Sequence, residues 1–148
     1  YRRARVHLGK DSAGIALCGH SLGSAIATEL AVEHAPAVLI LEAPFTSARE
    51  MARGPLAPVT LLWGVIARIH FDTRSRVAQL NVPTWVVHGE RDGIIPVRMG
   101  RAVHAAARIR GELLLVRGAG HNDVSDVAGE AYWSWLRRAL ESASNASR

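Results

Sequence analysis

Three residues of this chain have the types and the order that nucleophilic acyl chemistry uses: Ser21, then Asp92, then His121. A serine hydroxyl is a poor nucleophile until a base removes its proton, and a histidine is a common base for that step. A carboxylate behind the histidine holds the imidazole in the required tautomer and stabilises the imidazolium that forms. The first hypothesis is therefore covalent catalysis through Ser21.

Ser21 lies in the pentapeptide Gly-His-Ser-Leu-Gly at residues 19–23, directly after the apolar run at residues 15–18. A serine between a strand and a helix, with small residues on both flanks, is the pattern of a nucleophile elbow. The helix that is expected to begin near Leu22 would point its free N–H groups at the serine oxygen. We therefore expect the backbone N–H of Leu22 to stabilise an oxyanion formed there.

Asp92 and His121 each follow a short run of aliphatic or β-branched residues, at 84–87 and at 113–116. Such runs predict buried strands. The carboxyl ends of parallel strands meet at one edge of a sheet, which is where open α/β sheets place their sites. The spacing thus predicts that the loops of Ser21, Asp92 and His121 meet in space.

Strands and helices alternate along the chain, which predicts a parallel α/β sheet of about four strands flanked by helices. The expected strands are residues 14–18, 38–41, 84–88 and 112–116, and the expected helices are residues 22–34, 96–107 and 124–142.

Apolar spacing also predicts the buried faces of two of these helices. The first helix carries an apolar stripe at Leu22, Ile26 and Leu30, and its Ala25 and Ala27 are expected to let it pack closely on the sheet. The expected buried face of the last helix is Val127, Ala131, Trp135 and Leu136.

Residues 45–81 interrupt this alternation, because Pro55, Pro58 and Gly64 break an apolar section. Short helices that form a cap beside the site are one interpretation, and a single crossover helix is the other. In the first, an acyl pocket is lined by Phe45, Leu62 and Trp63. The alternative for these three side chains is ordinary core packing, in a capping helix or in the crossover helix.

The composition fits one domain, since the chain has 148 residues of which 49% are hydrophobic. We expect no membrane-spanning segment, no disulfide framework (Cys18 is the single cysteine) and no metal or cofactor, because metal-ligand spacing is lacking. The net charge is +5, but the basic residues are spread without interleaved aromatics, so a nucleic-acid partner is not expected. The first residue is Tyr1, which leaves targeting open, with a cytoplasmic location favoured.

Four segments carry a resemblance to a known family: residues 15–24, 42–47, 88–96 and 118–123. On them, residues 14–123 resemble the serine hydrolases of the α/β-hydrolase superfamily, most closely the lysophospholipase-like or depalmitoylase-like branch. The resemblance implies cofactor-free hydrolysis of a carboxylic ester or thioester through an acyl-serine intermediate. The implied substrate is a small molecule with an apolar acyl group.

The same resemblance implies the catalytic residues Ser21, Asp92 and His121. Glu90 and Asp123 are alternatives for the acid. Asp92 is favoured because it stands at the family position and because Asp123 is available to cap the helix that follows it.

The chain departs from this family before its first strand. Such hydrolases carry several further strands there, including a loop with an H-G motif that donates the second oxyanion hydrogen bond, whereas only residues 1–13 precede the Gly14 strand here. We therefore expect the C-terminal part of the fold, as one incomplete domain over residues 1–148, whose N-terminal half is missing or is supplied by another chain.

Two further functions remain compatible with these residues. A truncated, non-catalytic hydrolase-like module could bind a partner through the unpaired edge of its first strand. An acyltransferase could use the same three residues with an alcohol or an amine in place of water.

Overall fold

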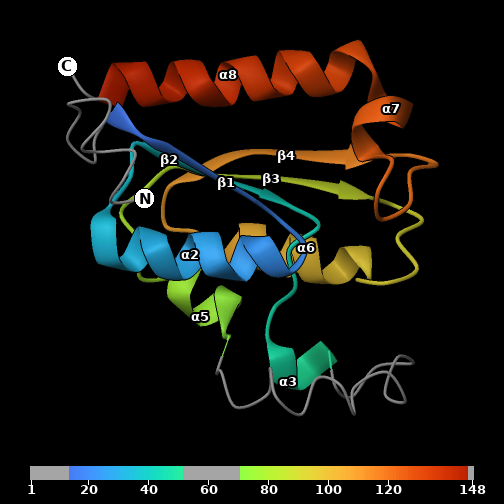
Figure 1. Cartoon of the computed structure of the whole chain (residues 1–148), viewed down its shortest axis with the longest axis horizontal. Helices are drawn as coiled ribbons and strands as arrows, with labels where there is room; N and C mark the ends of the chain where they lie inside the picture. The colour runs from blue at the N-terminus through green and yellow to red at the C-terminus, as the bar shows by residue number, and fades with distance from the viewer. Residues whose placement is uncertain (1–13, 52–70, 147–148) are drawn as a thin grey trace.

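The computed structural model describes residues 14–51 and 71–146, which are drawn in colour in Figure 1. They form a four-stranded parallel sheet with the strand order β1-β2-β3-β4. The strands are β1 (Ala16–His20), β2 (Val38–Glu42), β3 (Thr84–Gly89) and β4 (Arg110–Val116). The predicted parallel sheet of about four strands is confirmed.

The register of the sheet brings the ends of the strands together. His20 at the end of β1 pairs with Glu42 on β2, and Glu42 pairs with Val87 on β3. Gly89 at the end of β3 in turn pairs with Val116 at the end of β4. The loops that carry Ser21, Asp92 and His121 therefore leave the same edge of the sheet.

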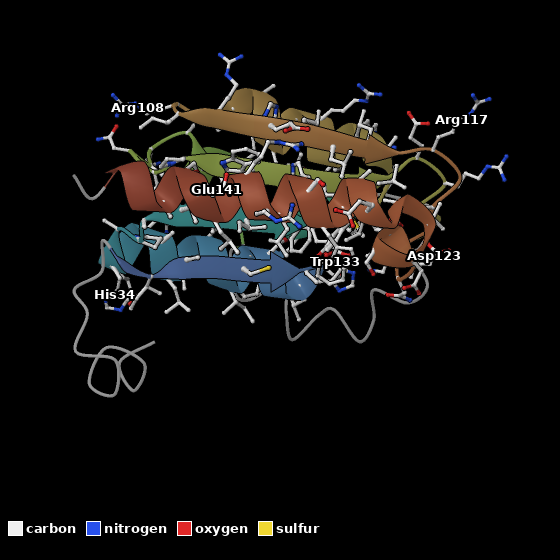
Figure 2. The ribbon with its side chains drawn as sticks, turned by 90° about the horizontal axis from the view of Figure 1, so that it is seen from above. His34, Arg108, Arg117, Asp123, Trp133 and Glu141 are labelled. Atoms are coloured by element: carbon white, nitrogen blue, oxygen red, sulfur yellow. The ribbon has the colours of Figure 1, made fainter. Side chains whose placement is uncertain are left out.

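Helices cover both faces of the sheet (Figure 1). One face is covered by α2 (Leu22–His34) and α6 (Val97–Ala106), with α5 (Thr73–Val77) packed against both. The opposite face carries α7 (Val124–Ala128) and α8 (Glu130–Ala146). In Figure 2, which looks down on α8, the four strands lie side by side beneath that helix.

The buried side chains fall into three clusters that follow these layers. The cluster between the sheet and α2, α5 and α6 includes Leu39, Leu41, Val86 and Val103, all without exposed surface. The cluster beneath α7 and α8 is centred on Trp135, which packs edge-on against Trp85 of β3 with the ring centroids 6.1 Å apart.

The third cluster lies outside the sheet, beneath α3 (Ala48–Met51). Its buried members are Ala25, Phe45, Ala48, Met51, Ile95 and Met99. Ile95 and Met99 follow β3, so this cluster holds the loop that carries Asp92 against α2.

The apolar stripe predicted on the first helix is not its buried face, since Leu22 and Leu30 are only partly buried, whereas the close packing expected of Ala25 and Ala27 is confirmed. The buried residues of α2 are Ser24, Ala25, Ala27, Thr28 and Ala31, whereas Ile26 is 48% exposed. Small side chains let the axis of α2 approach the sheet closely, so the face of the helix that carries them is the buried one.

The single helix expected over residues 124–142 is two helices. The chain turns at Gly129, where φ is 52° and ψ is −127°, and α8 starts in a new direction. The turn moves Val127 and Ala131 to exposed positions, while Trp135 stays fully buried and Leu136 partly buried. The prediction thus holds for the second half of the segment only.

The segment at residues 45–81 is described at its two ends, by α3 and α5. Leu62 and Trp63 lie outside the described residues, so the cap and the acyl pocket stay predictions. Among the helices at residues 14–51 and 71–146, none is long and apolar enough to cross a membrane.

Candidate active site

Ser21 occupies a sharp turn between β1 and α2. Its backbone has φ 54° and ψ −121°, in the left-handed half of conformational space that costs a residue with a side chain energy. The turn is held because the N–H of Ser21 donates to the Glu42 carbonyl at 2.9 Å, and the N–H of Ser24 donates to the Ser21 carbonyl at 2.9 Å. This backbone presents the half-buried Ser21 hydroxyl at the edge of the sheet.

Gly19 explains why the turn can be so tight. A Cβ atom at Gly19 would lie 2.3 Å from the carbonyl oxygen of Gly23 and 2.8 Å from the Cα of Ser24. Both contacts are with backbone atoms of α2, which cannot move aside. A residue without a side chain is therefore required where β1 ends.

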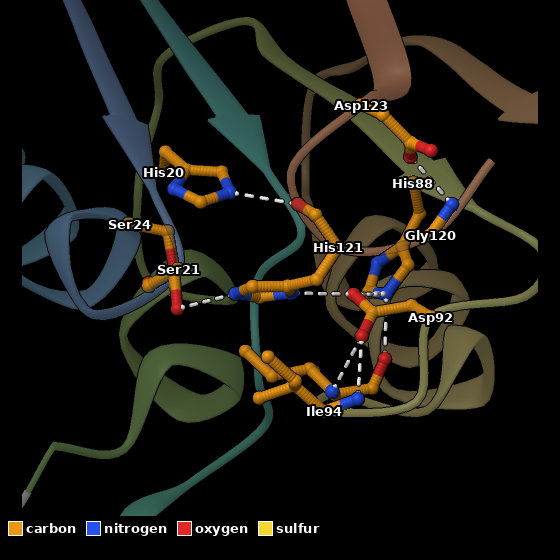
Figure 3. A network of polar contacts seen from close by, with 10 residues as sticks. His20, Ser21, Ser24, His88, Asp92, Ile94, Gly120, His121 and Asp123 are labelled. Atoms are coloured by element: carbon orange, nitrogen blue, oxygen red, sulfur yellow. Dashed lines mark hydrogen bonds and ion pairs between the residues drawn. The ribbon is translucent and has the colours of Figure 1, made fainter. Parts of the chain in front are cut away.

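His121 joins the serine to the acid (Figure 3). Its Nε2 lies 3.0 Å from the Ser21 Oγ, and its Nδ1 lies 2.7 Å from the Oδ2 of Asp92. Because the carboxylate accepts from Nδ1–H, the neutral ring presents Nε2 as an acceptor to the serine hydroxyl. The structure thus brings the three residues predicted from the sequence into one hydrogen-bonded line.

Asp92 accepts hydrogen bonds on both carboxylate oxygens. Oδ1 accepts the backbone N–H groups of Ile94 and Ile95, each at 2.8 Å, while Oδ2 faces His121 and lies 3.3 Å from the Nε2 of His88. Burial alone would raise the pKa of this carboxyl. The donors outweigh it, His88 and His121 first and the two backbone groups next, and they hold the pKa of Asp92 well below its ordinary value.

The two alternative acids lie elsewhere. Glu90 is exposed and its carboxylate lies 3.8 Å from the guanidinium of Arg101. The carboxylate of Asp123 accepts the backbone N–H of Gly120 at 2.6 Å. Asp123 precedes α7, but the expectation that its side chain caps this helix is wrong, because the carboxylate makes no capping hydrogen bond and contacts the turn at Gly120 instead.

Two further histidines lie near this line: from their places in the sequence, His88 is expected to help order the loop of the acid, and His20 to pack or hydrogen-bond beside the serine. The Nε2 of His20 donates to the backbone carbonyl of His121 at 3.0 Å, and the buried His88 lies behind Asp92 (Figure 3). His20 precedes the nucleophile and His88 ends β3. Their positions at strand ends were visible in the sequence, but their partners depend on how the loops fold.

Two of the remaining predicted site residues, Leu22 and Phe45, lie among the described residues but outside the hydrogen-bonded line. Leu22 is the first residue of α2, so its N–H is one of the free groups at that helix end. Phe45 has no exposed surface and packs in the cluster beneath α3. No group of three His, Cys, Asp or Glu side chains suited to a metal ion occurs among residues 14–51 and 71–146.

Comparison with known sequences finds relatives that include proteins named for an alpha/beta hydrolase domain. No protein-family model matches the chain. An uncharacterized protein of Mycobacterium tuberculosis, Rv2307c, is 35% identical over 133 residues, covering 88% of this chain and 46% of that protein. Human alpha/beta hydrolase domain-containing protein 17B is 28% identical over 134 residues, covering 90% of this chain and 43% of that protein. The chain thus spans less than half the length of both curated relatives.

Solved structures share the fold. The esterase domain of a Rhodothermus marinus protein superposes with a TM-score of 0.65 at 18% identity, covering 94% of this chain and 65% of that one. An alpha/beta fold family hydrolase from Bacillus anthracis gives a TM-score of 0.73 at 11% identity, covering 93% of this chain and 70% of that one. At these identities the likeness concerns the fold alone.

Proposed function

We propose that this chain is part of a serine hydrolase that cleaves a carboxylic ester or thioester. The chain carries part of the α/β-hydrolase fold and has relatives named for a hydrolase domain. The observation that carries the proposal is the continuous line from the Ser21 Oγ through His121 to Asp92, at 3.0 Å and 2.7 Å.

In the first half of the reaction, His121 Nε2 takes the proton of the Ser21 hydroxyl as Oγ attacks the acyl carbon. Asp92 stabilises the imidazolium that forms, because its carboxylate is ionised and fixed by backbone N–H groups. Collapse of the tetrahedral intermediate releases the alcohol or thiol, which leaves with the proton from His121. The product is an acyl ester of Ser21.

In the second half, a water molecule replaces the leaving group. His121 removes a proton from that water as its oxygen attacks the acyl carbon, and returns the proton to Ser21 Oγ as the acid product leaves. An oxyanion forms in both halves, and the N–H of Leu22 at the start of α2 is our candidate donor to it.

Labelling with a fluorophosphonate probe tests the proposal, because such probes react with activated serines. The protein is expressed with any coding sequence continuous with Tyr1 and Arg148, and peptide mapping locates the adduct. We expect one adduct on Ser21, absent in Ser21→Ala and in His121→Ala, with Ser47→Ala as a control at a serine outside the line. A folded protein that is not labelled would contradict the proposal.

Substrate class follows from a matched series. Nitrophenyl esters and acyl thioesters of increasing acyl length are compared by initial rate, with and without added alcohols and amines. Our proposal expects a free acid as the main product. A dominant transfer product would favour the acyltransferase alternative, and a partner complex unaffected by Ser21→Ala, without turnover, would favour the interaction module.

A further inference from the structure

His88 is a fully buried histidine at the end of β3, on the side of Asp92 away from the serine. Its Nε2 lies 2.9 Å from the backbone carbonyl of Ile95 and 3.3 Å from the Oδ2 of Asp92 (Figure 3). Its Nδ1 is buried and has no hydrogen-bond partner among the described residues. The two nitrogens of this ring therefore face different surroundings.

These surroundings determine where the proton of the ring lies. Both neighbours of Nε2, a carbonyl and a carboxylate, are acceptors, so we assign the proton to Nε2. A proton on Nδ1 would be a buried donor without an acceptor, which is costly. His88 consequently donates from Nε2 toward Asp92 and Ile95.

The ring is also fixed by packing. Gly100 on α6 lies against its Nδ1 side, and a Cβ atom at Gly100 would be 2.3 Å from Nδ1 and 3.0 Å from Cγ. Helix α6 packs on β3, so its backbone holds the ring from one side while the Asp92 loop contacts it from the other. The Nε2–H of His88 can therefore point only toward Asp92 and Ile95.

We propose that His88 is a positioning residue for the acid: it fastens the loop from Asp92 to Ile95 at both ends, so that Oδ2 stays aimed at His121. Oδ1 is already occupied by the N–H groups of Ile94 and Ile95. With His88 on the remaining side, the carboxylate cannot rotate without losing several hydrogen bonds. The effect on rate rests on the proposed hydrolase function, whereas the effect on the Asp92–His121 hydrogen bond does not.

Two variants of nearly equal size separate donation from packing. His88→Gln places an amide N–H near the position of Nε2, and His88→Met fills the same space without a donor. Each is measured by the rate of fluorophosphonate labelling at Ser21 and by the proton NMR resonance of the His121 Nδ1–H. Thermal unfolding of each variant checks the fold.

For His88→Met we expect labelling to slow by about tenfold or more, the loss associated with a buried hydrogen bond to a charged group. The His121 Nδ1–H resonance is expected to move or to broaden, because Oδ2 loses one of its two donors or the loop loosens. For His88→Gln we expect labelling within about threefold of the unsubstituted protein and an unmoved resonance. Equal behaviour of the two variants in both measurements would overturn the proposal and leave His88 a packing residue.

Two other outcomes also decide. If the unsubstituted protein is not labelled at all, the hydrolase proposal fails, and the positioning role of His88 is then tested by the NMR comparison alone. If His88→Met does not fold, Gly100→Ala replaces it, because its methyl group presses on Nδ1 and displaces the ring while the donor is kept. We expect that variant to shift the His121 resonance, and an unshifted resonance would overturn the proposal.

Discussion

His20 and His121 contact each other through backbone and ring. The Nε2 of His20 donates to the main-chain carbonyl of His121 at 3.0 Å, and the two ring centroids are 4.9 Å apart with 47° between the planes. The residue before the proposed nucleophile therefore holds the residue proposed as its base. These residues come from the two outermost strands of the sheet, since His20 ends β1 and His121 follows β4.

Replacing His20 by Phe keeps a ring near His121 but removes the donor. We expect labelling of Ser21 to slow by about threefold to tenfold, because one hydrogen bond of this kind, here at an exposed position, contributes about 0.5–1.5 kcal/mol. His20→Gln, which retains an amide donor near Nε2, is the matched control and is expected to stay close to the unsubstituted rate. A Phe variant as fast as the Gln variant would show that the hydrogen bond has no part in placing His121.

Ser21 combines a strained backbone with the proposed nucleophile, and two substitutions separate these properties. Ser21→Ala and Ser21→Gly both remove the hydroxyl, so both are expected to abolish labelling. The glycine variant also relieves the left-handed conformation at φ 54°, which costs about 1–3 kcal/mol, against a chain-entropy cost of about 0.5–1 kcal/mol. We expect Ser21→Gly to be more stable than Ser21→Ala by about 1 kcal/mol in denaturant unfolding. A less stable glycine variant would contradict the strain.

The sequence predicted the line of Ser21, Asp92 and His121 because strand ends and motif order are local features. The parallel sheet followed from the same alternation of strands and helices. The partner of His20 could not be predicted from its own segment, because the fold brings His121 to it from 101 residues away. His88 instead contacts Asp92 and Ile95, four and seven residues later, so its place beside the loop of the acid followed from the sequence and only the individual contacts did not.

The buried faces of the helices were predicted less well, for two physical reasons. In α2, close approach to the sheet buries small and polar residues such as Ser24 and Thr28 instead of Ile26. At Gly129 one positive φ changes the helix direction, so periodicity counted across it misplaces Val127.

The two glycines that flank Ser21 do not share the steric role that the sequence pattern suggests for both. Gly19 would place a Cβ against backbone atoms of α2 at 2.3 Å, whereas a Cβ at Gly23 meets no heavy atom of the described residues within 4 Å. We expect Gly19→Ala to destabilise the fold by about 2–4 kcal/mol through overpacking and displacement of the turn. Gly23→Ala, within α2, is expected to be neutral or to stabilise by up to about 1 kcal/mol. Denaturant unfolding of the two variants measures this, and equal destabilisation would contradict the difference in packing.

The carboxylate of Asp92 makes stability depend on acidic pH. Its pKa in the folded protein is lowered, because the hydrogen bonds it accepts outweigh the effect of burial. It therefore contributes stability that is fully present above the unfolded pKa of about 3.9 and is lost as the pH falls from there toward the folded pKa. The side chain has no exposed surface, so this contribution is weakly screened by solvent.

Asp92→Asn removes this dependence. At pH 5 we expect the variant to unfold with a free energy lower by about 2–3 kcal/mol, since a buried charged acceptor is lost. The difference is expected to shrink steadily as the pH falls below about 4, because the Asp92 carboxyl of the unfolded, unsubstituted chain then takes up a proton while that of the folded protein stays ionised, which favours unfolding. Urea unfolding at intervals between about pH 5 and pH 2.5 measures it, in a window where the histidines of the unfolded chain stay protonated. Asp126→Asn, at an exposed position on α7, is the control and is expected to change stability little. A difference between Asp92→Asn and the unsubstituted protein that stays constant down to the lowest pH would contradict the lowered pKa, and with it the picture of an acid held ionised behind His121.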